Sequence, residues 1–173
     1  RACKYFLGTG QNASNTAVRG DMGWTSCMVR QRTEVCRLLL RLNQMEGKRI
    51  VRIIHEWGKT QPKSWEKRVY TMLRNHNVTE LVDADIPRKM KIAAFKDVFI
   101  QHDSNNWTQE LWNDRNKPNG NKLRTYRTFK TEPSTACYAV TVRYRDQRRV
   151  LSKFRCGNLP LAIETGRYSR SEE

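Results

Sequence analysis

Apolar side chains recur every three or four residues along most of the chain, and this spacing predicts helices rather than strands. The first such stretch lies between Ser26, a suitable helix cap, and Gly47, a suitable stop. Its apolar positions are Met28, Val35, Leu38, Leu39, Leu42 and Met45. The block from Lys48 to Trp57 predicts a second helix, whose apolar face comprises Ile50, Ile53, Ile54 and Trp57. Ser64 predicts the cap of a third helix, which carries Trp65, Val69, Met72 and Leu73.

The second half of the chain continues this pattern with shorter apolar stretches. Residues 89–101 predict a helix with Met90, Ala93, Ala94 and Val98 facing inward, and another helix begins near Ser104 and carries Trp107, Leu111 and Trp112. The stretch N-K-P-N-G-N at 116–121 predicts a turn. After it, Leu123, Tyr126 and Phe129 fit a helix slightly better than a strand. A last helix is predicted over about 142–154, with Val150, Leu151 and Phe154 packed inward.

These elements predict a mainly α protein, a small helical domain or bundle with a loop-rich N-terminus and an irregular C-terminal tail. Three regions follow in order: a loop-rich linker at 1–23, which is rich in Gly, Asn and Ser, a helical domain at 24–116, and basic helices with a tail at 122–173. The residues expected to be mostly buried are Trp24, Leu38, Leu42, Ile54, Trp65, Val69, Trp107 and Leu111.

Charge changes this picture from a generic helical protein to a candidate nucleic-acid binder. The formal net charge is +16, and it is patchy. Residues 1–76 hold 15 Lys/Arg and 5 Asp/Glu, residues 77–121 hold 6 and 7, and residues 122–173 hold 12 and 5. Two basic flanks of this kind are typical of proteins that bind nucleic acid. Since there is neither a run of about 20 apolar residues nor a free basic amphipathic helix, we expect no membrane partner.

Two tracts in the second basic flank combine guanidinium groups with aromatic rings. They are residues 122–127 (K-L-R-T-Y-R) and residues 143–149 (R-Y-R-D-Q-R-R). Arginine binds phosphate through two parallel hydrogen bonds, and tyrosine can stack on an unpaired base. The tracts and their C-terminal neighbour therefore provide the candidate contacts to RNA or DNA, which are Lys122, Arg124, Arg127, Arg145, Arg148, Arg149 and Arg155.

The sequence indicates no coherent active site, metal site or cofactor site. A small metal-dependent nuclease that uses Asp83, Asp85 and His102 is a third hypothesis, although an Asp pair directly before Ile86-Pro87 is more typical of the start of a helix than of a metal site. Five cysteines, at positions 3, 27, 36, 137 and 156, include no C-x-x-C pair. Free thiols indicate a reducing compartment inside the cell, the nucleus or the cytoplasm.

Four stretches of the chain, in this order, resemble one known family. They are residues 5–8 (Y-F-L-G), 17–24 (A-V-R-G-D-M-G-W), 122–130 (K-L-R-T-Y-R-T-F-K) and 153–168 (K-F-R-C-G-N-L-P-L-A-I-E-T-G-R-Y). Together they resemble the region that follows the polymerase in LINE-type (non-LTR) retrotransposon reverse-transcriptase polyproteins. The last block is the longest and the most specific.

The resemblance implies a non-catalytic segment that grips template RNA or target DNA, with the polymerase domain of the same polyprotein as a further partner. The parent polyprotein would be an RNA-directed DNA polymerase, but no Tyr-x-Asp-Asp polymerase motif occurs in this chain. Two alternatives stay open: a stand-alone basic adaptor that binds RNA, and an inactive relic of a retroelement.

If phosphate contacts dominate binding, affinity will depend steeply on salt. The logarithm of the association constant should fall linearly with the logarithm of salt concentration, by about 0.7 per contact on single strands and about 0.9 on duplex. Fluorescence anisotropy over a salt series measures this slope. An affinity that stays constant from low to moderate salt would contradict the interpretation.

Overall fold

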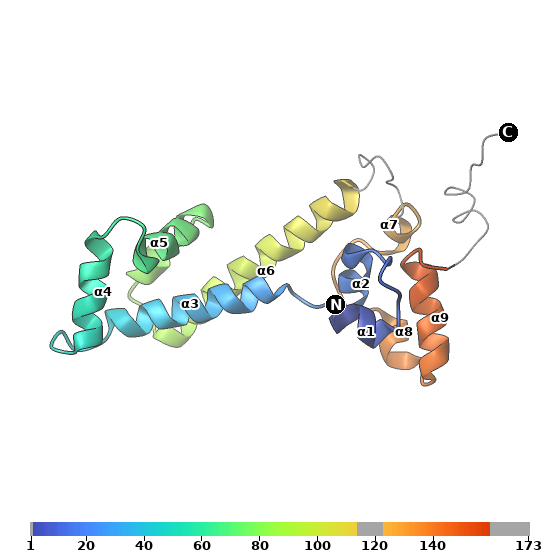
Figure 1. Ribbon diagram of the computed structural model, residues 1–173, viewed down its shortest axis with the longest axis horizontal. Coiled ribbons are helices and arrows are strands. Elements are labelled where there is room, and N and C mark those ends of the chain that lie inside the picture. The colour runs from blue at the N-terminus through green and yellow to red at the C-terminus, as the bar shows by residue number, and fades with distance from the viewer. Residues whose placement is uncertain (1, 114–122, 160–173) are drawn as a thin grey trace. The chain divides into compact units, whose positions relative to one another are not determined.

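The computed structural model describes residues 2–113 and 123–159, and most of these residues are helical (Figure 1), which confirms the predicted mainly α fold. The α-helices are α1 (Ala2–Leu7), α2 (Asn15–Met22), α3 (Cys27–Asn43), α4 (Ile50–Thr60), α5 (Trp65–Asn75), α6 (Arg88–Asn113), α7 (Tyr126–Phe129), α8 (Cys137–Thr141) and α9 (Arg145–Arg155), with the 3-10 helix η1 at Thr79–Val82. In the described ranges, β pairing is limited to an isolated antiparallel bridge between Met22 and Thr135. None of the described helices is both long enough and apolar enough to span a bilayer.

The N-terminal region is helical where its composition predicts loop. Ser14 caps α2 by accepting a hydrogen bond from the Ala17 backbone N–H, and Gly23 ends the helix at φ +63°. A side chain at Gly23 would be strained at that φ and would also strike the backbone of Thr135. Gly, Asn and Ser therefore lie at the ends of short helices here, which explains why a count of turn-forming residues is misleading.

The chain divides into two compact units, and the division differs from the predicted order of three regions. Unit 2 is continuous and covers Thr25–Asp103, whereas unit 1 combines Arg1–Trp24 with Ser104–Glu173. The first helices thus share a unit with the basic C-terminal helices. The predicted turn at 116–121 and the predicted tail from residue 160 lie outside the described residues.

The core of unit 2 joins α3, α5 and α6. Leu39, Leu73, Phe95 and Phe99 are almost completely buried in it. The structure has one 26-residue helix, α6, where two shorter helices were predicted. Its inward face is also different, because Phe95 and Phe99 are buried while Met90 is 58% exposed.

The core of unit 1 joins α1, α2, the C-terminal half of α6 and α7. Trp107 and Tyr126 are its largest buried side chains. Trp107 Nε1 donates a hydrogen bond to the Thr16 carbonyl oxygen at 2.8 Å, so the indole binds α2 by polar as well as apolar contact. Gly20 permits this approach, because a Cβ atom there would lie only 2.5 Å from the Trp107 ring.

Helix α4 packs by its polar face, which reverses the prediction. Its buried residues are His55 and Gly58. His55 Nδ1 lies 3.2 Å from Glu66 Oε1, and His55 Nε2 lies 2.9 Å from Asn43 Oδ1, so one imidazole connects α4 to α3 and α5. The predicted apolar face is exposed instead, at Ile50, Ile53, Ile54 and Trp57.

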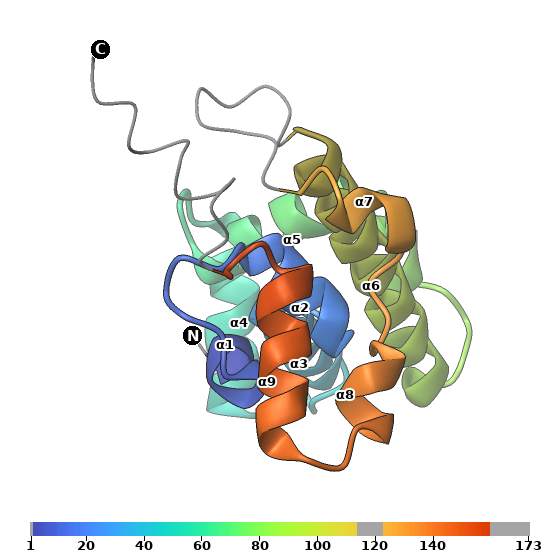
Figure 2. The same cartoon turned by 90° about the vertical axis from the view of Figure 1, so that its right-hand side faces the viewer.

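Helix α9 shows the same reversal. Ser152 is its buried residue, and the predicted inward residues Val150, Leu151 and Phe154 are all exposed. Figure 2 shows α9 beside α1 and α8 in unit 1. Of the eight residues expected to be buried, Leu42, Val69, Trp107 and Leu111 are buried and Trp65 is partly buried, whereas Trp24, Leu38 and Ile54 are exposed.

Substitution of two tryptophans tests which side chains are buried and which are exposed. Trp107→Ala should lower the free energy of unfolding by about 3–5 kcal/mol, because the indole is completely buried and the cavity cannot refill. Trp57→Ala, the matched control on α4, removes an indole that is 63% exposed. It should change the free energy of unfolding by less than about 0.5 kcal/mol. Denaturant unfolding followed by circular dichroism measures both. Equal losses in the two variants would contradict the burial of Trp107.

Candidate nucleic-acid interface

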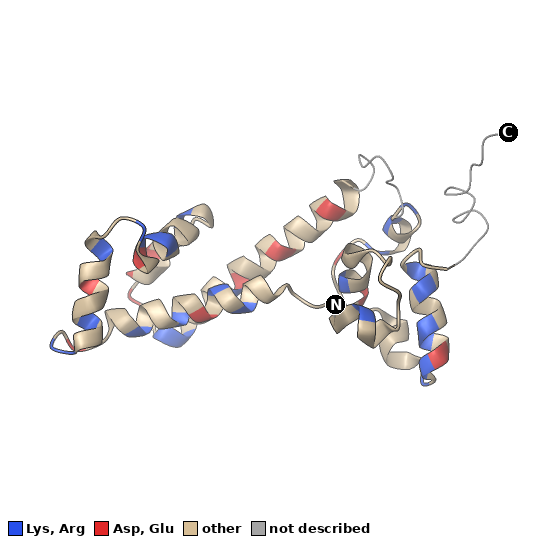
Figure 3. Ribbon diagram, viewed as in Figure 1, with Lys and Arg blue, Asp and Glu red and all other residues tan. Residues whose placement is uncertain are grey.

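The candidate interface lies in unit 1, where the six described residues of the seven predicted to bind nucleic acid have three different environments. Figure 3 shows Lys and Arg along α9. Arg145 and Arg149 are exposed and Arg148 is half-buried on that helix, while Arg124 is exposed in the turn before α7. Arg127 and Arg155 contact the interior of the unit. Lys122 lies outside the described residues.

Asp21, near the end of α2, is the centre around which α7, α8 and α9 are organised. Its carboxylate is completely buried. Arg155 donates two hydrogen bonds to it, from Nε to Oδ2 and from a terminal nitrogen to Oδ1, both at 2.8 Å. The Tyr126 hydroxyl donates to Oδ1 at 2.9 Å, and the Tyr138 hydroxyl donates to Oδ2 at 2.8 Å. Four hydrogen bonds thus satisfy a charge that would otherwise be costly to bury.

The aromatic rings around Asp21 also hold the arginine. The Arg155 guanidinium carbon lies 4.3 Å from the centre of the Phe129 ring and 5.2 Å from that of Tyr138. Burial, together with the nearby Asp21 charge, raises the pKa of the Tyr126 and Tyr138 phenols above their ordinary value. Both phenols therefore stay protonated at neutral pH and remain donors to Asp21.

Cys156, next to Arg155, is a structural thiol. It is buried, and burial raises its pKa to about 12 in spite of the neighbouring guanidinium group. A thiol of this kind is neutral at physiological pH and is a poor nucleophile. The five cysteines within the described residues are all free.

Two more basic side chains of the second flank are used inside unit 1. Arg127 is 7% exposed and donates to the Leu111 carbonyl oxygen at 3.0 Å, near the C-terminal end of α6, where a cation is favourable. Lys130 is also 7% exposed, and its Nζ donates to the carbonyl and hydroxyl oxygens of Ser134. Burial lowers the pKa of Lys130 from its ordinary value. Neither group is placed to meet a phosphate.

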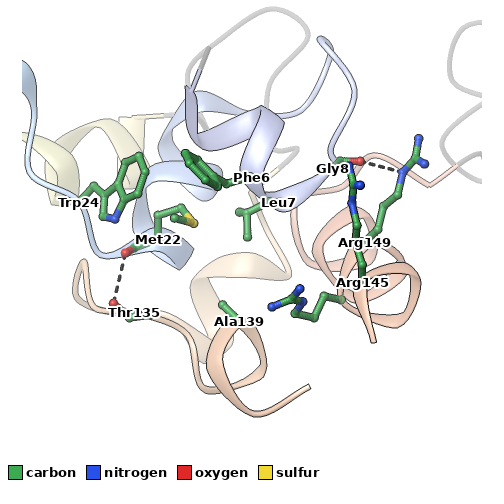
Figure 4. Close-up of a pocket in the computed structure, with 10 residues that line it drawn as sticks. Phe6, Leu7, Gly8, Met22, Trp24, Thr135, Ala139, Arg145 and Arg149 are labelled. Carbon is green, nitrogen blue, oxygen red and sulfur yellow. Dashed lines mark hydrogen bonds between the residues drawn. The ribbon is translucent and has the colours of Figure 1, made fainter. Parts of the chain in front are cut away.

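The three remaining arginines of α9 line one pocket. Arg145, Arg148 and Arg149 share it with Phe6, Leu7, Gly8, Met22, Trp24, Thr135 and Ala139, and its volume is about 260 Å³. Figure 4 shows the rings of Phe6 and Trp24 on one side and the side chains of Arg145 and Arg149 on the other. Sequence reasoning identified the arginines but missed both aromatic residues, because nothing in the sequence brings positions 6 and 24 next to α9.

The electrostatics of the pocket favour an anion. Arg149 Nε donates to the Gly8 carbonyl oxygen at 3.1 Å, which fixes the start of its guanidinium group. Within the part of the chain that the structure describes, no carboxylate lies within ion-pair distance of Arg145, Arg148 or Arg149, and none of the residues that line the pocket is acidic. Three neighbouring cations that form no ion pair within the described residues repel one another, and an anionic ligand would relieve that repulsion.

Unit 2 has a second basic groove, which is a weaker candidate. Arg41, Arg49 and Arg88 line it together with Gln44, Met45 and Glu46, and its volume is about 300 Å³. Arg88 donates to the Arg37 carbonyl oxygen at 3.2 Å. Because Glu46 partly neutralises this groove and no aromatic ring lines it, it has less to offer a nucleic acid than the pocket of unit 1.

The alternative site for metal-dependent cleavage gains no support from the geometry. Among the described residues, no three or more His, Cys, Asp or Glu side chains gather in a way that could hold a metal ion. Asp83 and Asp85 follow η1, whereas the His102 ring packs edge-to-face on the His76 ring at 4.5 Å. The three residues that a nuclease would need are therefore not brought together.

Comparison with known proteins adds no relative to this description. No family model matches the chain, and neither a curated protein nor a solved structure matches it.

The Asp21 cluster predicts how Tyr126→Phe behaves. Because Asp21 loses a buried donor, the free energy of unfolding at pH 7 should fall by about 1–3 kcal/mol. In the wild-type protein the unfolded state ionises its tyrosines above about pH 10, while the folded state keeps Tyr126 protonated, so stability falls as pH rises. The variant should lose less stability over that range. Denaturant unfolding at pH 7 and from about pH 9 to pH 11 measures both effects.

Tyr144→Phe is the matched control, since that ring is 66% exposed. We expect it to unfold like the wild-type protein at each pH. An equal effect of the two substitutions would contradict the placement of Tyr126 on Asp21.

Proposed function

We propose that this chain is a non-catalytic, nucleic-acid-binding segment of a retrotransposon reverse transcriptase, which grips template RNA or target DNA through Arg145, Arg148 and Arg149. The observation that carries the proposal is the set of three α9 guanidinium groups around one pocket, with no acidic residue among the described residues that line it. A phosphate supplies the missing negative charge, and it accepts the two parallel hydrogen bonds that a guanidinium group donates.

The proposal is supported by a division among the arginines of unit 1: some bind groups of the chain itself, and others line the pocket. Arg127 and Arg155 are committed to carbonyl and carboxylate groups of the chain itself. Arg145, Arg148 and Arg149 follow one another at positions i, i+3 and i+4, so a single face of α9 presents them together. A rigid helix that carries three cations on one face tracks a phosphate backbone at little cost in side-chain entropy.

The reverse-transcriptase part of the proposal rests on the resemblance of four sequence blocks. Their described residues belong to unit 1: Leu7 lies in its core, Asp21 is contributed by the second block, Tyr126 by the third and Arg155 by the fourth. On this proposal the blocks maintain the folded unit. Helix α9, which leads into the fourth block, contacts the nucleic acid. The protein would act where RNA and DNA are, in the nucleus or the cytoplasm.

The stand-alone adaptor would use the same arginines, so binding alone does not distinguish it. A polymerase coding sequence directly upstream of this segment supports the retrotransposon origin, and an independent reading frame supports the adaptor.

Arg148→Glu/Arg149→Glu tests the interface. Each substitution replaces a cation near phosphate by an anion, so we expect affinity for a short RNA or DNA to fall by about 100-fold or more at moderate salt, with a smaller salt slope because fewer counterions are released. Arg148→Lys should lose less affinity than the double variant, since the positive charge remains and only the two parallel hydrogen bonds of the guanidinium group are lost. Fluorescence anisotropy gives the affinities, and circular dichroism verifies the fold.

Lys67→Glu/Arg68→Glu is the control. It makes the same change in net charge on an exposed turn of α5 in unit 2. We expect only the modest loss that follows from the lower net charge. If both double variants lose affinity equally, α9 is not the binding face.

A further inference from the structure

We propose that the pocket of unit 1 receives one unpaired base of a single strand, stacked on the Phe6–Trp24 pair, while Arg145, Arg148 and Arg149 hold the adjoining phosphates. This inference rests on the proposed function and deepens it: it assigns the nucleic acid a class, single-stranded, and a contact, base stacking. The inference rests on the rings of Phe6 and Trp24, which lie outside both basic tracts.

The aromatic side of the pocket has ring surface available for stacking. Phe6 is 66% exposed and Trp24 is 41% exposed. The two rings meet edge-to-face, with centroids 5.4 Å apart and an interplanar angle of 73°. In that geometry the edge of one ring contacts one face of the other, and the exposed ring surface that remains can receive a planar base. Exposed aromatic rings beside cations are typical of surfaces that bind single strands.

The basic side of the pocket is fixed by backbone geometry. Gly8 has φ +61°, and a Cβ atom at that position would lie 2.9 Å from Arg149 Cγ. The missing side chain at Gly8 therefore lets α9 approach the end of α1 and lets Arg149 reach the Gly8 carbonyl oxygen. This contact places the guanidinium groups across the pocket from the rings, as in Figure 4.

The size and lining of the pocket limit what it accepts. About 260 Å³ lies just below the range of roughly 300–1,000 Å³ that is typical of drug-sized ligands, and it suits one base with part of its sugar. Among the described residues that line the pocket, the uncharged polar side-chain groups are the Trp24 indole N–H and the Thr135 hydroxyl, and the latter already donates to the Met22 carbonyl oxygen. With few groups to read base edges, the pocket should bind a base by its flat face, tolerate all four bases, and exclude bases held in a duplex.

Three oligonucleotides of equal total charge test the inference: a single strand, the same strand with abasic sites, and a blunt duplex of half the length. Their affinities for the full chain are measured by anisotropy at one salt concentration. We expect the intact single strand to bind about 5- to 100-fold tighter than the abasic strand, which corresponds to one stacked base. We also expect it to bind tighter than the duplex.

The variant Phe6→Ala/Trp24→Ala removes the stacking surface. It should abolish the preference for the intact strand and leave the affinity for the abasic strand and the salt slope unchanged. Trp24→Phe should retain most of the preference. Trp57→Ala, which removes an exposed indole from α4, is the matched control and should behave as the wild-type protein does. Because the preference of the wild-type protein is itself an outcome, the test does not depend on the variant folding.

The failures of the two proposals are distinguishable. If intact and abasic strands bind the wild-type protein equally, and Arg148→Glu/Arg149→Glu still abolishes binding, the stacking inference is overturned and the proposed function stands. If the wild-type protein binds none of the three oligonucleotides at low salt, both are overturned.

Discussion

The buried ion pair between Asp21 and Arg155 is the interaction on which unit 1 depends. It joins α2 to the end of α9, and the two phenols on the same carboxylate add α7 and α8. Asp21 is completely buried, although the Arg155 side chain is 22% exposed, and a carboxylate in that position is costly unless its remaining lone pairs are satisfied. Tyr126 and Tyr138 meet that condition because their hydroxyls donate to Oδ1 and Oδ2, and their raised pKa values keep them protonated at alkaline pH as well. Removing any one of these groups leaves the others incompletely satisfied in a dry interior.

This constraint explains which arginines of α9 can meet a ligand. Once Arg155 reaches Asp21 and Ser152 lies 3.0 Å from the Tyr138 hydroxyl, the rotation of α9 about its own axis is fixed. Arg148 and Arg149, one turn before Ser152, must then lie toward α1 and the pocket. The binding face is therefore set by a buried carboxylate on a different helix, and a change at Asp21 would disturb the pocket without touching it.

The mainly α fold was predictable because helical spacing recurs along the chain, and Ser64, for example, caps α5 as predicted. Which side of α4 and of α9 is buried could not be predicted. Hydrophobic periodicity assigns the apolar side of a helix to the interior, but His55 and Ser152 place these two helices polar side inward through contacts with residues distant in sequence. The site was half predictable for the same reason. Local tracts identify Arg145, Arg148 and Arg149, whereas Phe6 and Trp24 join them only through tertiary contacts.

The discontinuity of unit 1 has a consequence for co-translational folding. Asp21 and Arg155 are 134 residues apart, and all of unit 2 is translated between them. At about 5–20 residues per second, roughly 7–27 seconds pass between the synthesis of Asp21 and that of Arg155. Unit 2 can form its own core in that interval, since its residues are contiguous and complete at Asp103. Helices α1 and α2 therefore leave the exit tunnel before unit 2 and reach their final packing after it.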